Sequence, residues 1–187
     1  MLRRRDPNVV GQAYGFQAMT PIRPGEEDAL RAYLEGLYDD DRPSPLAKLE
    51  RTHIARWVII TDFVNDRAWG QRRAEHLELP YLVFTSNFDG DLDSYLDELC
   101  SKLATEAAEV WGRCVGCPVQ AEGAALKAYL KHNQVDCGLF FTPYGDATVP
   151  VVKDALAQRE QMIAFATDSQ GLDPAALQAA FVREFGG

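Results

Sequence analysis

The sequence predicts an α+β fold, a ferredoxin-like split βαββαβ unit with a four-stranded antiparallel sheet and extra C-terminal helices. The first observation behind this prediction is the order of hydrophobic periods, which gives strand, helix, strand, strand, helix, strand. The second is that every predicted strand is apolar on both faces. Because both main helices of such a unit lie on one face, we expect a second copy of the chain to cover the other, giving a dimeric α+β barrel.

The segment 79–103 shows the change of period most clearly. A strand, LPYLVFTS, passes through a polar corner, NFDGD, into a helix over LDSYLDELCSKL. Aspartates crowd this corner, where side-chain oxygens can accept hydrogen bonds from the first amides of the helix. One apolar stripe follows along the helix, formed by Leu92, Tyr95, Leu96, Leu99 and Leu103.

The remaining elements follow from the same two periods. Residues 1–10 are expected to be a loose N-terminus, and residues 11–187 to form one domain with a helical C-terminal extension. Further strands are predicted within residues 11–22 and 52–63 and over Leu139–Phe141. Further helices are predicted within residues 26–37, 123–133, 148–166 and 174–185, with a short helical turn after Pro45.

Composition narrows the classes of function. The formal net charge of −9 argues against nucleic acid and anionic membranes as partners, since both are bound through cationic surfaces. No apolar run reaches the roughly 18 residues of a membrane span, and no hydrophobic segment follows the N-terminal arginines as in a signal peptide. We therefore expect a cytoplasmic protein.

Several blocks of the chain resemble an uncharacterised bacterial group that is similar to dye-decolorising-peroxidase-like and other dimeric α+β barrel proteins. The blocks are THIARW, LPYLVFTSNFDGDLDSYLDEL, VWGRCVGCP, LKAYLKHN and LFFTPYGDATVPVVKDALAQREQMIAF. Ser86–Gly90 also resembles the GxxDG motif of those peroxidases, whose aspartate helps to activate peroxide above a haem, with Ser86 in place of the first glycine. The resemblance implies a haem-dependent, peroxidase-like oxidoreductase acting on a hydrophobic small molecule. Those enzymes contain two such units, with the haem-ligating histidine and a distal arginine in the second.

Five residues are candidates for a site. Asp89 is a candidate acid–base residue, with Asn87 orienting a ligand, and the alternative is that Asp89 caps a helix. His53 is predicted on the same strand face as Trp57 and could serve as an axial ligand or a base, or could simply be a hydrogen-bonded residue at a strand end. Arg56 faces the other side of that strand and is the second candidate catalytic residue.

The four cysteines are expected to be reduced structural thiols. Cys114 and Cys117 form a C-x-x-C pair, but the spacing to Cys100 and Cys137 matches no zinc motif. The pair also follows a predicted helix, whereas redox-active pairs open one. We expect no metal site.

Aromatic side chains could line a cavity for a planar ligand, or could belong to the core or to a dimer interface. They are Trp57, Tyr81, Phe84, Phe140, Phe141 and Tyr144. The leading functional hypothesis is therefore a small protein with an apolar pocket that binds or transforms a hydrophobic molecule. The alternative is a non-catalytic binding or interaction module without a cofactor.

Overall fold

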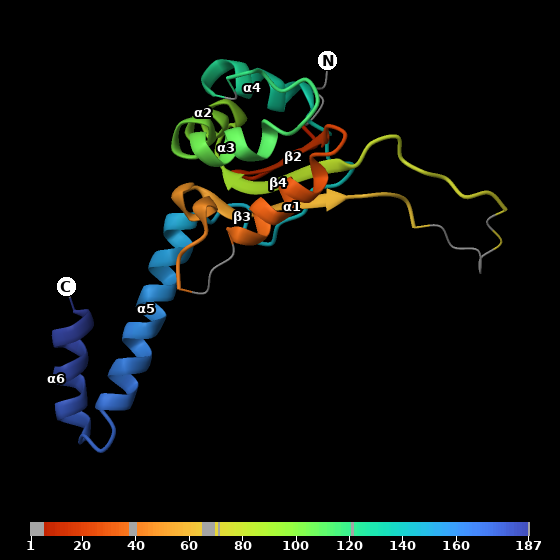
Figure 1. Cartoon of the computed structure of the whole chain (residues 1–187). Coiled ribbons are helices and arrows are strands. Elements are labelled where there is room, and N and C mark those ends of the chain that lie inside the picture. Colours follow the sequence, from red (N-terminus) through yellow and green to blue (C-terminus); the bar gives the residue numbers. More distant parts are fainter. Residues whose placement is uncertain (1–5, 38–40, 65–69, 71, 121, 187) are drawn as a thin grey trace, which may run out of the picture. The chain divides into compact units, whose positions relative to one another are not determined.

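The chain forms two compact units, Met1–Val149 and Pro150–Gly187. The computed structural model describes all residues except 1–5, 38–40, 65–69, 71, 121 and 187. The first unit contains a sheet and helices, and the second is a hairpin of two helices (Figure 1).

The sheet of the first unit has four antiparallel strands in the order β1-β2-β4-β3. The strands are β1 (Val9–Val10), β2 (Ala13–Pro21), β3 (Thr52–Ile60) and β4 (Tyr81–Asp89). β4 lies between β2 and β3 and pairs with both along its length. The predicted α+β class with a four-stranded antiparallel sheet is thus confirmed, and the segment with the clearest strand pattern occupies the centre of the sheet.

Helices cover one face of this sheet (Figure 1). They are α1 (Glu27–Gly36), α2 (Leu92–Lys102), α3 (Ala104–Trp111) and α4 (Gly123–His132), with a 3-10 turn, η1 (Pro45–Lys48), before β3. The predicted stripe of α2 faces the sheet, because Tyr95, Leu96 and Leu99 are all fully buried. The helix ends at Lys102, and α3 continues the chain in a new helix from Ala104.

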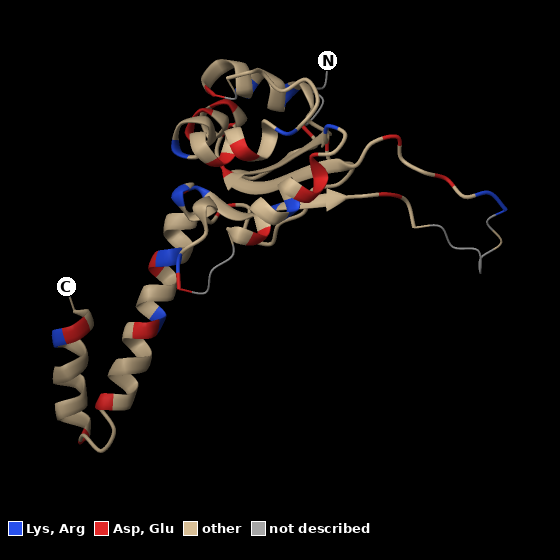
Figure 2. Cartoon of the chain, viewed as in Figure 1, with Lys and Arg blue, Asp and Glu red and all other residues tan. Residues whose placement is uncertain are grey.

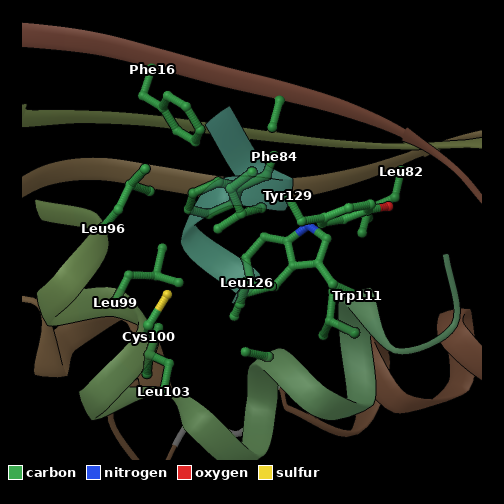
Figure 3. Packing of buried hydrophobic residues seen from close by; sticks show 14 of the residues in the cluster. Phe16, Leu82, Phe84, Leu96, Leu99, Cys100, Leu103, Trp111, Leu126 and Tyr129 are labelled. Carbon is green, nitrogen blue, oxygen red and sulfur yellow. The ribbon is translucent and has the colours of Figure 1, made fainter. Parts of the chain in front are cut away.

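The hydrophobic core lies between this face and the helices (Figure 3). Every second residue of β4 contributes to it, including Phe84 and Phe88. The Phe84 ring meets the Trp111 ring edge-on, with centroids 5.4 Å apart, and the Phe88 ring stacks on Tyr95 at 3.6 Å. Contacts of this kind add roughly 0.5–1.5 kcal/mol each to the burial of the rings.

The strand predicted over Leu139–Phe141 is wrong, because these residues belong to no strand. The outer edge of β2, where such a strand would pair, is already occupied. β1 pairs with its first part, and the next part bonds to residues 133–135 through a single bridge between Ala18 and Gln134. Leu139 and Phe141 are instead 89% and 78% exposed, so their apolar character does not reflect burial.

The N-terminal segment is anchored from Asp6 onward. Residues 1–5, half of the segment predicted to be loose, lie outside the described residues, and Val9–Val10 form β1. Asn8 is buried, and its side chain donates to Asp136 Oδ1 at 2.9 Å and accepts from the Cys137 amide at 2.8 Å. These bonds join the start of the chain to the segment that follows α4.

The second face of the sheet carries apolar side chains that no described helix covers. Ile54 and Val58 of β3 are 64% and 42% exposed, and Met19 and Ile60 are exposed as well. At one end of this face the Phe140 ring lies over Gly15, where an added Cβ would come within 3.0 Å of it. The two-faced apolar pattern therefore corresponds to a core on one side and to a largely open surface on the other.

The second unit consists of most of α5 (Val149–Asp168) and of α6 (Pro174–Phe185). Asp173 caps α6 as its sequence position predicts, accepting from the amides of Ala175 and Ala176. The two helices meet through a cluster of Phe165, Phe181 and Phe185, with ring centroids 5.0–5.8 Å apart. Among the described residues, no helix is both long enough and apolar enough to cross a membrane.

Candidate functional site

Asp89 joins three parts of the first unit. It is the last residue of β4 and only 6% exposed. Its Oδ1 lies 2.8 Å from His53 Nε2, and its Oδ2 accepts from the backbone amide of Val149 at 2.7 Å. Because Val149 is the first residue of α5, the carboxylate satisfies an amide that the helix leaves unpaired.

The cap of α2 is a different aspartate from the one at the end of β4. Asp91 Oδ1 accepts from the Ser94 amide at 2.8 Å, and this bond holds the pKa of Asp91 below its ordinary value. Asp89 is thus a helix cap, as the alternative interpretation proposed, but of a helix that begins 60 residues later in the chain. The sequence thus correctly indicated that Asp89 caps a helix, but local spacing did not reveal which helix it caps.

A β-bulge determines where His53 points. The register between β3 and β4 shifts between Thr52 and Ile54, so His53 leaves the regular alternation of the strand. Its ring Nε2 lies 2.8 Å from Asp89 Oδ1, which leaves Nδ1 as the ring nitrogen without this partner. The predicted proximity of His53 and Trp57 on one strand face assumed a regular strand, which the bulge interrupts.

Asn87 and Arg56 lie on the open face of the sheet. Asn87 pairs in register with Gly15, the residue under the Phe140 ring. Arg56 lies opposite Thr85, and its Nε donates to the Thr85 hydroxyl at 3.1 Å. Thr85 and Asp89 are four residues apart on β4, about 13 Å, so Arg56 and Asp89 do not converge on one reacting atom.

Trp57 lies on the helix-covered face, with its ring centroid 5.6 Å from Phe84 and 6.1 Å from Trp111. Its indole Nε1 is buried without a hydrogen-bond partner among the described residues. Ser86, which replaces the first glycine of the motif, is also a core residue, since its hydroxyl lies 2.6 Å from that of Tyr95. These residues stabilise the core from β3 and β4.

The aromatic residues named from the sequence do not surround one cavity. Trp57 and Phe84 pack in the core, whereas Phe141 and Tyr144 are exposed. The alternative in which several of them are core residues therefore holds for Trp57 and Phe84.

A hollow of about 350 Å³ lies beside β3. Its walls come from the end of α1, the residues that follow it, η1 and β3, and include both Arg56 and Trp57. The other lining residues are Leu34, Leu37, Arg42, Ser44 and Leu46. Among these described lining residues none is acidic, so the described wall is mostly apolar and includes two guanidinium groups. Sequence reasoning found Arg56 and Trp57 but missed the leucines, whose helical stripe indicated only a buried face.

All four cysteines are free thiols, as expected. Burial raises the pKa of Cys114 to about 11, and the Thr20 hydroxyl donates to its sulfur at 3.4 Å. Burial likewise raises the pKa of Cys117. Thiols of this kind stay protonated near neutral pH and make poor nucleophiles and metal ligands. Among the described residues, no group of three or more His, Cys, Asp or Glu side chains could hold a metal ion.

The residues that the peroxidase resemblance assigns to haem chemistry do not converge on one site. The candidate ligand His53 and the candidate acid–base residue Asp89 are hydrogen-bonded to each other, and the second Asp89 oxygen is bound to Val149. Arg56 is too far along the sheet to act with them. Comparison with protein-family models, curated proteins and solved structures found no match to this chain.

Proposed function

We propose that the first unit binds a small apolar molecule that carries an anionic group, in the hollow beside Arg56. The observation that carries this proposal is the composition of the described wall, which combines leucine and tryptophan side chains with Arg42 and Arg56 and includes no acidic residue among those described. Pockets for small ligands are typically apolar with a few polar groups that fix orientation. A guanidinium group suits a carboxylate or sulfonate, because it presents several N–H donors in one plane.

Arg56 has donors to spare for such a ligand. Among the described residues its guanidinium has one hydrogen-bond partner, the uncharged Thr85 hydroxyl. A bound anion would therefore meet a positive charge that no described carboxylate neutralises. Since the Arg56 side chain is exposed, we expect its contribution to affinity to be modest, about threefold to tenfold.

Binding is favoured over haem-dependent oxidation because two of the other candidate site residues already have hydrogen-bond partners within the protein. Asp89 and His53 are engaged in holding the start of α5, and this role requires no ligand. The function proposed is thus the binding alternative of the two hypotheses, with a hydrophobic small molecule as the partner.

Two fluorescent probes test this proposal. 1-Anilinonaphthalene-8-sulfonate carries a sulfonate, whereas N-phenyl-1-naphthylamine has the same rings without the charge. We expect the wild-type protein to bind the sulfonate more tightly, and Arg56→Gln to weaken the sulfonate alone by about threefold to tenfold. The control Arg72→Gln removes an equal charge outside the hollow and should leave both affinities unchanged. Equal affinities of wild type and Arg56→Gln for the sulfonate would refute the proposal.

A second proposal concerns the open face of the sheet. We propose that the first unit is a ferredoxin-like unit and that two copies pack these faces together into a dimeric α+β barrel. Ile54 and Val58 support it, because large exposed aliphatic side chains on one face are typical of an interface. The strands are almost free of charged residues, although the chain carries a net charge of −9, so two copies of this face would not repel each other strongly (Figure 2).

Sedimentation over a range of concentrations tests the dimer. We expect Val58→Glu to dissociate it, because each copy would bury an unpaired carboxylate. Val64→Glu is the matched control, since Val64 is already 94% exposed in the connection between β3 and β4. A wild-type protein that remains monomeric, or a self-association constant that Val58→Glu leaves unchanged, would contradict this proposal.

A further inference from the structure

Within the described residues of the second unit, one face of α5 has no partner. α6 contacts the opposite face, where Gln161 donates to Glu184 at 3.0 Å and Phe165 meets the α6 phenylalanines. An α-helix turns about 100° per residue, so Leu156, nine residues before Phe165, points away from α6. Val152, Leu156 and Ile163 recur at the spacing of a helix–helix seam, and Leu156 and Ile163 are 53% and 47% exposed.

The second unit lacks the usual means of stabilising so short a chain. None of the described residues of Pro150–Gly187 is buried. Units below about 40 residues generally need disulfides, metals or oligomerisation. This segment contains no cysteine, and no described cluster in it could hold a metal. Association through the free face of α5 is the remaining route.

The charges of α5 indicate what kind of partner fits. Lys153 and Asp154 lie before Leu156, and Arg159 and Glu160 follow it (Figure 2). If a second α5 crosses antiparallel near Leu156, Lys153 of each copy lies beside Glu160 of the other, on the border of the seam. A parallel pair in register would place Lys153 beside Lys153 of the second copy and Glu160 beside its Glu160. Of these two arrangements, only the antiparallel one therefore brings opposite charges of the two copies together.

We propose that the second unit is a self-association module in which α5 packs antiparallel against α5 of a second copy. Val152 of one copy then contacts Ile163 of the other, and Leu156 lies close to the twofold axis. Arg159 also falls in the seam, where its methylene groups can cover Leu156 of the second copy while its guanidinium stays in water. With α6 on the outer side of each α5, the assembly is a four-helix bundle.

Charge reversal on the full-length chain tests this arrangement. Lys153→Glu and Glu160→Lys each place like charges at both symmetry-related pairs, and we expect either one to raise the dissociation constant about fivefold to thirtyfold. The double variant Lys153→Glu/Glu160→Lys restores opposite charges and should return the constant to within about twofold of wild type. Asp168→Lys, on the α6 side of α5, is the matched control and should leave it unchanged.

A second variant separates this interface from the open sheet face. Leu156→Asp should abolish association through α5 and leave any effect of Val58→Glu intact, with unchanged helical circular dichroism showing that the helices persist. A monomeric wild type would overturn the proposal. This result is expected if the free face of α5 binds the first unit or a different protein instead. In the Val58→Glu background, where the open sheet face cannot hold two copies together, dimerisation that resists Leu156→Asp would overturn it as well. So would single reversals that the double variant does not rescue.

Discussion

Replacing Asp89 by alanine should destabilise the first unit by about 2–3 kcal/mol. The loss of a helix cap costs about 1 kcal/mol. Here that loss is the bond from the buried Val149 amide. Removal of the carboxylate also breaks the bond to His53, which adds roughly 1–2 kcal/mol. This second cost stays below the upper limit for bonds to charged groups, because the His53 side chain is 24% exposed and can recover a water partner.

Urea unfolding followed by tryptophan fluorescence measures this change. Asp89→Asn retains an acceptor for Val149 and should lose about half as much stability, whereas His53→Ala loses only one bond, about 1 kcal/mol. Asp154→Ala removes an exposed carboxylate of α5 and should stay within about 0.5 kcal/mol of wild type.

A specific outcome would refute the reasoning. If Asp89→Ala unfolds at the same urea concentration and with the same slope as wild type, then the carboxylate does not hold the start of α5. Hydrogen exchange gives a local check, because the Val149 amide should lose protection in Asp89→Ala and in no control.

Three further predictions concern the first unit. Gly15→Ala should lower stability by about 1 kcal/mol, since the new Cβ would meet the Phe140 ring at 3.0 Å. Adding Phe140→Ala should remove that cost. Thermal denaturation of the single and double variants measures both effects. Cys114, whose pKa burial raises to about 11, should react with a disulfide reagent at pH 8 about a hundredfold more slowly in the native protein than in urea. Burial tends to raise the pKa of Glu106, but the bond to Lys48, the charge of Lys48 and a bond to the Glu106 backbone together outweigh burial and lower this pKa. The pair therefore stabilises the fold above pH 4.5 and loses effect as the pH falls below that. Glu106→Gln should cost up to about 1 kcal/mol at pH 7 and less at pH 3 in denaturant titrations.

Local pattern was enough to locate most elements. The stripe from Leu92 to Leu99 gave both the extent of α2 and its buried face, because neither depends on distant contacts. β4 was likewise evident from its composition. Its place at the centre of the sheet follows from the predicted strand order.

Non-local contacts account for the differences. The run Leu139–Phe141 has strand-like composition, but residues 133–135 and β1 already occupy the edge that it would need. A bulge at His53 cannot be read from alternation, and it moves this side chain towards Asp89. The amide that Asp89 caps belongs to a helix distant in sequence, which only the folded chain brings near.

The position of β3 at the end of the sheet has one more consequence. An edge strand leaves a row of backbone N–H and C=O groups unpaired along one side, which invites end-on addition of strands from other molecules and growth of fibrils. Arg56 places a positive charge in the middle of this strand, and the bulge at His53 disturbs its regular repeat. Both features oppose the addition of further strands at this edge. Neutral substitutions of Arg56 should therefore promote aggregation, and Arg56→Lys is the safer background for long measurements.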